Sequence, residues 1–235
     1  MMAAAILTGM ALEARIVRRG GLPVACATGH AAARVAAHRL LEGGACGIVS
    51  FGIVGGLAPD LRPGSLVLAS AVVDEDGAVH ETYLPWRKRL RNALPQAHSG
   101  MVVGARMPAA TVGDKARLHA LTGAAAVDLE SLAVARACQA WGRPFAVLRA
   151  VADPAWRALP AAALAGLDGG GRMAPGAVLA RLAADPRDLV ALGRLAWDLG
   201  KALASLRGAA RAIPVDLLGG GPLGLDPAQR VRDVA

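Results

Sequence analysis

Two apolar segments that each end in an acidic residue constrain the fold of this chain more than any other feature. The first, residues 126–131, contains Asp128 and Glu130, and the second, residues 145–151, is followed by Asp153 and a proline. Short apolar runs bounded in this way are typical of buried strands. In open α/β sheets, ligands bind where such strands end. Because a carboxylate buried there loses hydration free energy unless a partner binds it, the two segments predict a functional site at this edge of a sheet.

Strands and helices alternate along the rest of the chain. The predicted strands are residues 3–8, 22–27, 47–51, 66–73 and 100–105. The predicted helices are residues 31–42, 114–121 and 132–141, and a further helix is expected to begin within residues 9–19. A tight loop is expected at residues 52–56, where three glycines lie close together. The alternation predicts an α/β fold with a mostly parallel, twisted central sheet flanked by helices.

The length of the chain favours a single domain with a helical C-terminal part. The 235 residues suffice for one α/β domain, which is predicted to span residues 1–210. Within it, residues 154–210 form a helical addition, with helices at 177–184 and 189–206 and a glycine-rich loop at 167–176. Residues 211–235 contain three successive glycines followed by a proline and are predicted to form a flexible tail.

Arginine supplies nearly all the positive charge. The formal net charge is +8, and the chain contains 23 Arg but only 3 Lys. A basic balance is typical of proteins that bind nucleic acid or anionic membranes. Here the arginines are scattered among aspartates, so no nucleic-acid partner is predicted.

One basic segment has two interpretations. Trp86, Arg87, Lys88, Arg89 and Arg91 follow one another closely with no acid between them. The segment is either a solvated loop or short helix, or a contact with anionic lipid headgroups. No uncharged apolar run reaches about 18 residues, and the apolar N-terminus lacks the basic start of a signal peptide. A cytoplasmic protein is predicted, with peripheral contact at the inner membrane face as the alternative.

The cysteines and histidines predict no metal site. Cys26, Cys46 and Cys138 lie far apart in apolar stretches, which favours buried thiols in a reducing cytoplasm. The five histidines show no metal-ligand spacing. Neither a metal nor an organic cofactor is therefore predicted.

Four segments, taken together and in order, resemble the methylthioadenosine/adenosylhomocysteine nucleosidases of the purine nucleoside phosphorylase superfamily. They are residues 8–14 (TGMALEA), 50–58 (SFGIVGGLA), 127–130 (VDLE) and 149–153 (RAVAD). The resemblance implies the nucleoside phosphorylase fold and cleavage of the bond between a base and a ribose. Such cleavage builds positive charge on the ribose and negative charge on the purine, so carboxylates in different environments can serve as acid, base and ribose clamp.

The resemblance also implies a role for each of three acids. Asp153 would supply a proton to the purine at N7, and Glu130 would bind the ribose hydroxyls. Glu13 would activate the attacking water or make a second ribose contact. From the residues alone, Glu130 is also readable as an acid at a helix N-terminus, Asp153 as the cap of a turn and Glu13 as a surface residue of an early helix.

The other residues of the implied substrate site come from the same segments. Leu129 stands where the family has a methionine that packs on the sugar. Gly52, Ile53 and Val54 form the glycine segment, and Thr28 offers a hydroxyl from the turn at 28–31. Asp128 is included, with a structural role expected rather than a catalytic one. Arg149 is expected to be the buried or interface ion-pair partner of a nearby acid.

Departures from the family pattern leave the attacking group open. Ile53 and Val54 offer no hydroxyl, and no arginine lies between Arg39 and Arg62 to bind phosphate. These absences favour water, whereas phosphate remains a candidate co-substrate. Residues 111–125 contain no aromatic side chain to stack on the base, so the base must pack on an aliphatic wall or on a ring from elsewhere.

A narrower resemblance covers nearly the whole chain. Residues 126–131 and 149–155, continued by 157–160 and the loop at 167–169, look like the hopanoid-associated phosphorylase subfamily. That resemblance implies release of adenine from adenosylhopane, a nucleoside with a large apolar 5′ substituent, and the superfamily implies a homo-oligomer. The alternatives are a methylthioadenosine/adenosylhomocysteine-type nucleosidase, a purine nucleoside phosphorylase, and a non-catalytic protein that binds a nucleoside or a lipid.

Overall fold

The computed structural model describes residues 3–18, 21–165 and 188–213. The glycine-rich loop predicted at 167–176, the helix predicted at 177–184 and the tail from residue 214 onward lie outside these ranges. Of the residues described, no helix is both long and apolar enough to cross a membrane.

Eight strands of the described ranges form the centre of the molecule. They are β1 (Ala5–Thr8), β2 (Val24–Cys26), β3 (Ile48–Gly56), β4 (Leu66–Val73), β5 (Val79–Glu81), β6 (His98–Gly104), β7 (Ala126–Asp128) and β8 (Phe145–Asp153). The sheet order is β2-β1-β3-β7-β6-β4-β5, and β8 pairs with both β3 and β4. Five of the eight strand pairings are parallel, which confirms the prediction of a mostly parallel sheet. The pairings also close a ring, β3-β8-β4-β6-β7, that sequence patterns did not indicate.

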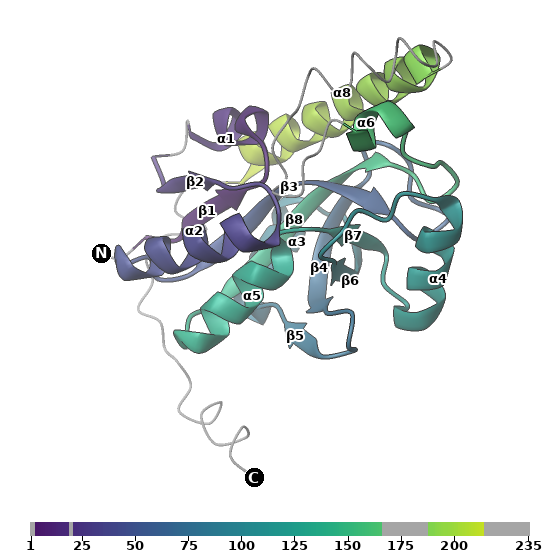
Figure 1. Ribbon diagram of the computed structural model, residues 1–235. Helices are drawn as coiled ribbons and strands as arrows, with labels where there is room; N and C mark the ends of the chain where they lie inside the picture. Colours follow the sequence, from purple (N-terminus) through teal and green to yellow (C-terminus); the bar gives the residue numbers. More distant parts are fainter. Residues whose placement is uncertain (1–2, 19–20, 166–187, 214–235) are drawn as a thin grey trace.

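Helices cover the sheet on both sides. They are α1 (Ala11–Val17), α2 (His30–Glu42), α3 (Leu84–Ala93), α4 (Val112–Thr122), α5 (Ser131–Ala140), α6 (Ala161–Ala165) and α8 (Asp188–Ala212). Helices α2 and α5 lie side by side on one face, and α1 and α8 lie together on the other (Figure 1). β8 contributes Val147 and Val151 to the core under α2 and α5, and Leu148 and Ala150 to the core under α3 and α8. Burial on both faces explains why β8 reads as a continuous apolar run.

The prediction of a tight loop at residues 52–56 is wrong, because β3 continues as a strand through Gly56. It pairs with β8 along this stretch, with a register shift between Val54 and Gly55, and its last two residues pair with β7. The glycines of this stretch do not form a turn. Their missing side chains allow other residues to approach the strand closely. An added Cβ at Gly52 would lie 2.7 Å from the carboxyl oxygens of Glu13 and from Arg149 Nη1.

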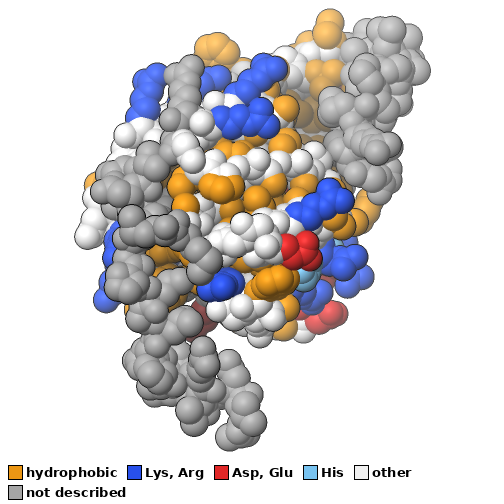
Figure 2. Space-filling model, turned by 90° about the vertical axis from the view of Figure 1, so that its left-hand side faces the viewer, with side chains coloured by type: hydrophobic (Ala, Val, Ile, Leu, Met, Phe, Trp, Pro, Cys, Tyr) orange, Lys and Arg blue, Asp and Glu red, His pale blue; other side chains and the backbone are white. Residues whose placement is uncertain are grey.

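The basic segment 84–91 belongs to helix α3. Trp86 is only 5% exposed and packs in the core under α3 and α8, so the predicted lipid contact through Trp86 is wrong. Arg87 donates a hydrogen bond to the carbonyl of Ser70 at 2.7 Å, while Lys88 and Arg89 are exposed. On the face drawn in Figure 2, Lys and Arg side chains occur in separate places around a central apolar and uncharged area.

Two further predictions need correction. Cys26 is exposed rather than buried, because β2 is the edge strand of the sheet; Cys46 and Cys138 are buried as predicted. Helix α8 ends at Ala212, six residues beyond the predicted end at 206, because its apolar face continues through Leu206 and Ala209 against the sheet.

Two glycines allow a matched test of backbone packing. An added Cβ at Gly104 would lie 2.3 Å from Leu132 Cβ and 3.0 Å from Leu132 N, whereas Gly200 on α8 faces open space. We expect Gly104→Ala to lower the free energy of unfolding by about 1–3 kcal/mol through overpacking. Gly200→Ala should raise it by about 0.5–1 kcal/mol, because alanine is the better helix former. Urea unfolding midpoints measure both, and an unchanged midpoint for Gly104→Ala would contradict the close approach of β6 and α5.

Candidate active site

A buried arginine organises the acids that the sequence singled out. Arg149 lies in the middle of β8 and is 1% exposed. Its Nη2 lies 2.5 Å from Asp128 Oδ2 and 3.5 Å from Glu130 Oε2. The same nitrogen donates to the hydroxyls of Ser50 at 2.8 Å and Ser131 at 3.2 Å. The expectation that Arg149 is a buried ion-pair partner is confirmed.

Asp128 is bound by Arg149 and Ser131. Besides Arg149, its Oδ2 accepts a hydrogen bond from the Ser131 hydroxyl at 2.5 Å, and its Oδ1 accepts one from the Ser131 backbone N–H at 3.0 Å. The latter bond ties the end of β7 to the first residue of α5. These contacts support the structural role expected for Asp128, whereas its contact with substrate remains a prediction.

Glu13 enters the same region from the first turn of α1. Its Oε2 accepts hydrogen bonds from the backbone N–H groups of Gly9 at 2.9 Å and Met10 at 2.8 Å. Its Oε1 accepts one from Ile53 N–H at 2.8 Å, which joins α1 to β3. Burial raises the pKa of Glu13, and the charge of Arg149 and the three N–H groups oppose that rise. A buried carboxylate with a raised pKa is suited to accept a proton from water.

Glu130 stands at the N-terminus of α5. Its Oε1 accepts a hydrogen bond from Gly29 N–H at 2.9 Å, immediately before α2 begins. Burial raises the pKa of Glu130 to about 7; the charges of Asp128 and Glu13 add to the rise, and Arg149 and the Gly29 N–H oppose it. An added Cβ at Gly9 would lie 3.1 Å from the Glu130 carboxyl group. Because Gly9 has no side chain, Glu130 can approach the same residue whose backbone N–H binds Glu13.

Asp153 ends β8 and has a partner that sequence reasoning missed. Lys115 of α4 is completely buried, and its Nζ lies 2.5 Å from Asp153 Oδ2. Burial raises the pKa of Asp153, and the charge and hydrogen bond of Lys115 oppose the rise. One signal for Lys115 was available: it is one of only three lysines in an arginine-rich chain. Its distance of 38 residues from Asp153 gave no indication of contact.

The structure places the remaining predicted site residues in different surroundings. Thr28 donates its hydroxyl to the Gly9 carbonyl at 2.5 Å, close to Glu130. Ile53 and Leu129 are half-buried. Val54 is 3% exposed and packs in the core under α2 and α5, so its side chain belongs to the core rather than to a solvent-facing surface.

Glu13 and Glu130 are thus brought together at Arg149. Asp153 lies on β8, the strand that carries Arg149. Asp153 pairs with Gly55 of β3, two residues beyond the Ile53 N–H that binds Glu13. An added Cβ at Gly55 would lie 3.3 Å from Asp153 Oδ2. That all three carboxyl groups face one substrate cavity remains a prediction.

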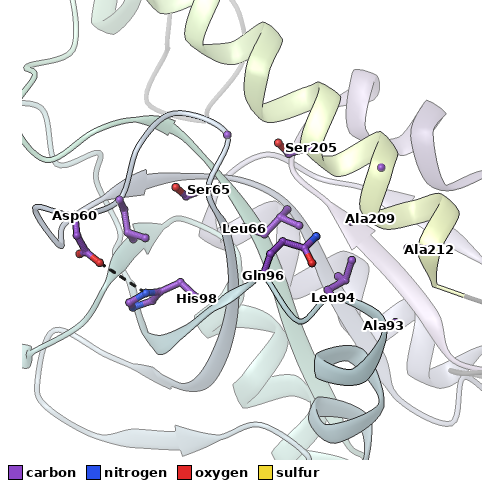
Figure 3. Close-up of a pocket in the computed structure, with 13 residues that line it drawn as sticks. Asp60, Ser65, Leu66, Ala93, Leu94, Gln96, His98, Ser205, Ala209 and Ala212 are labelled. Carbon is purple, nitrogen blue, oxygen red and sulfur yellow. Dashed lines mark ion pairs between the residues drawn. The ribbon is translucent and has the colours of Figure 1, made fainter.

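A cavity of about 560 Å³ is lined by other residues than these acids, and Figure 3 shows its lining. It is bounded by the start of β4, the end of α3 and the C-terminal half of α8, with Leu66 and Leu94 among its apolar residues. His98 Nδ1 lies 4.0 Å from Asp60 Oδ2 at its edge. None of the residues lining it belongs to the predicted site.

Over the described ranges, no group of three His, Cys, Asp or Glu side chains is placed to hold a metal ion.

The fold of this chain is similar to that of several solved nucleosidases. No curated protein matches the chain in sequence. A methylthioadenosine/adenosylhomocysteine nucleosidase from Colwellia psychrerythraea 34H, solved in complex with adenine, is similar in structure, with a TM-score of 0.70 and 18% identity over 93% of this chain and 96% of its own. The corresponding nucleosidase from Helicobacter pylori gives a TM-score of 0.65 and 17% identity over 91% and 99% of the two chains.

A second kind of relative has the same fold. Futalosine hydrolase from Helicobacter pylori strain 26695 gives a TM-score of 0.61 and 20% identity, over 65% of this chain and 88% of its own. These likenesses establish the α/β nucleoside phosphorylase fold, with its central sheet flanked by helices and a helical C-terminal segment. Residues 4–163 match the phosphorylase superfamily in sequence, and the chain belongs to that superfamily.

Proposed function

We propose that this protein cleaves the N-glycosidic bond of an adenosine-type nucleoside. The observation that carries the proposal is the gathering of Glu13 and Glu130 at Arg149, with Asp153 four residues beyond Arg149 at the end of β8. The superfamily match and the adenine bound to the Colwellia nucleosidase support a purine as the leaving group.

The proposed reaction assigns one step to each acid. Asp153 donates a proton to N7 of the purine while the C1′–N9 bond breaks and its electron pair passes to the base. Glu130 accepts hydrogen bonds from the ribose hydroxyls and stabilises the cationic sugar. Glu13 accepts the proton of the water molecule that attacks C1′. Proton transfers of this kind each contribute about 10²–10⁴-fold to a rate, provided that the pKa values lie near the working pH.

Water is the proposed attacking group. The guanidinium of Arg149 is already bound to Asp128 and two serine hydroxyls, so it is poorly placed to bind phosphate as well. Ile53 and Val54 offer no hydroxyl. Phosphorolysis is the alternative outcome of the experiment below.

The proposed substrate carries an apolar group at its 5′ carbon, as in adenosylhopane. The support is the narrower sequence resemblance described above, together with the Helicobacter pylori nucleosidase, which was solved with butyl-thio-DADMe-Immucillin-A. A nucleosidase for methylthioadenosine or adenosylhomocysteine is the second candidate, and the same relatives support it. A homo-oligomer and a cytoplasmic location are proposed with either substrate.

Base release tests the proposed function directly. We expect the wild-type protein to release adenine from a 5′-alkylthioadenosine, with 5-alkylthioribose rather than 5-alkylthioribose 1-phosphate as the sugar product. Asp153→Asn and Glu13→Gln should each slow release by about 10²-fold or more, because each removes one proton transfer. Chromatography with and without phosphate separates adenine and the two sugar products. Equal, negligible release by wild type and Asp153→Asn would favour the non-catalytic alternative.

The pH dependence of binding tests the role of Glu130. Ribose hydroxyls donate to an ionised carboxylate, so affinity for an uncleavable nucleoside analogue should rise as the pH increases through about 7, the pKa of Glu130. Glu130→Gln should bind more weakly and lack this step. Calorimetry between about pH 6 and pH 8 measures both, with free adenine as the control ligand because it carries no ribose. A step of the same size for adenine would assign the titration to another group.

Membrane contact through α3 is a separate proposal, now resting on Lys88, Arg89 and Arg91 without Trp86. Such charges near an anionic surface are worth about 1 kcal/mol each at low salt. We expect wild type to float with phosphatidylserine vesicles and Lys88→Ala/Arg89→Ala to float less. Arg34→Ala/Arg39→Ala, which removes two exposed charges from α2, serves as the matched control. Equal flotation of all three proteins would exclude α3 as the contact.

A further inference from the structure

Lys115 is a buried cation whose hydrogen-bonding capacity is fully used. Its side chain is 0% exposed. Its Nζ donates to Asp153 Oδ2 at 2.5 Å, to the Pro154 carbonyl at 2.9 Å and to the Arg157 carbonyl at 2.8 Å. Three acceptors match the three N–H donors of an ammonium group, so the charged form fits the site. Lysine is almost never completely buried unless it is paired, and removing one partner of such a pair leaves an uncompensated charge.

The contacts of Lys115 fix the place of Asp153. Two of its acceptors are backbone carbonyls of the segment that follows β8, so α4, the end of β8 and that segment meet at one nitrogen. Helix α4 itself begins with a capping box in which Thr111 and Asp114 exchange hydrogen bonds, and this sets where Lys115 enters. Lys115 binds Oδ2 of Asp153, and no hydrogen bond from Lys115 to Oδ1 is formed among the described residues.

We propose that Lys115 is a positioning residue that orients Asp153 and stabilises the carboxylate left behind when Asp153 gives its proton to the purine. This inference rests on the proposed function. In the step concerned, the proton moves from Asp153 to N7 as the C1′–N9 bond breaks, and the Asp153 oxygen keeps the electron pair of its O–H bond. Lys115 keeps all three of its protons throughout.

The charges around Asp153 support this role. Burial favours the neutral acid and raises the pKa of Asp153, and an acid that holds its proton too firmly is a poor donor. Lys115 acts in the opposite direction and is the larger of the two cationic influences. The second is Arg157, which follows β8 and is itself ion-paired with Asp198 of α8. Burial and Lys115 therefore have opposite effects on the pKa of Asp153.

Replacing the charged Lys115 tests the inference. The pKa of Asp153 and the pH profile of adenine release are the readouts, and a loss of stability alone changes neither. Lys115→Met should raise the pKa of the Asp153 carboxyl, measured by carbon NMR of the ¹³C-labelled protein with Asp153→Asn to identify the signal. The high-pH limb of adenine release should move to higher pH by about one unit, and kcat should fall about tenfold or more. In an Asp153→Asn background, Lys115→Met should cause no further loss of kcat, because Lys115 acts through Asp153.

Two variants separate charge from packing. Thr82→Val removes a buried hydroxyl that donates to the Ala69 and Ser70 carbonyls, far from Asp153, and should lower stability while leaving the pH profile unchanged. Lys115→Arg keeps the charge and should restore the wild-type limb of the pH profile. If Lys115→Met does not fold, Lys115→Gln retains an amide donor for the two carbonyls and takes its place in both measurements.

The outcomes distinguish this inference from the proposed function. If wild type releases adenine but neither the Asp153 signal nor the high-pH limb moves in Lys115→Met, Lys115 is only structural and the inference is overturned. If the Asp153 signal shifts but wild type cleaves no 5′-alkylthioadenosine, the proposed function fails, whereas the control of the Asp153 proton by Lys115 stands.

Discussion

The buried ion pair between Arg149 and Asp128 is the interaction on which the rest of the site depends. Arg149 is 1% exposed and would lose several kcal/mol of hydration free energy if it were unpaired. Its guanidinium reaches Ser50 on β3, Asp128 at the end of β7 and Ser131 at the start of α5. One side chain thus fixes three elements relative to β8, and the carboxyl group of Glu130 is placed within 3.5 Å of it.

Two buried cations divide the acids into two sets with different properties. Around Arg149, Asp128 is bound closely and Glu130 more loosely. Burial raises the pKa of Glu130 to about 7, and the charge of Arg149 only partly opposes this rise. Lys115 binds one carboxylate, that of Asp153, and its other two hydrogen bonds go to backbone carbonyls. The first set suits a group that accepts hydrogen bonds from a sugar, and the second suits a group that must release a proton. Environments that separate the pKa values of chemically similar acids are the usual basis for assigning acid and base roles.

Most elements were predictable because their patterns are local. The strand at Leu66–Val73 and the helix at Ser131–Ala140 follow from apolar runs and helical spacing, and the structure has them within a residue of the predicted ends. The predictions failed where distant groups decide. Gly52 and Gly55 suggested a turn, yet they are strand residues whose missing side chains make room for Glu13 and Asp153. Trp86 suggested a surface anchor, yet the side of α3 that carries it packs against the sheet.

The sequence alone determined the fold class, the acids at the strand ends and the expectation that Arg149 pairs with a nearby acid. Each of these depends on residue type and on spacing along short stretches of chain. Only the tertiary structure decided that β8 pairs with both β3 and β4, that Glu13 reaches β3, and that Lys115 meets Asp153. The physical reason is that a contact between residues 38 or more apart depends on how whole elements pack. Residue spacing carries no information about that packing once a turn intervenes.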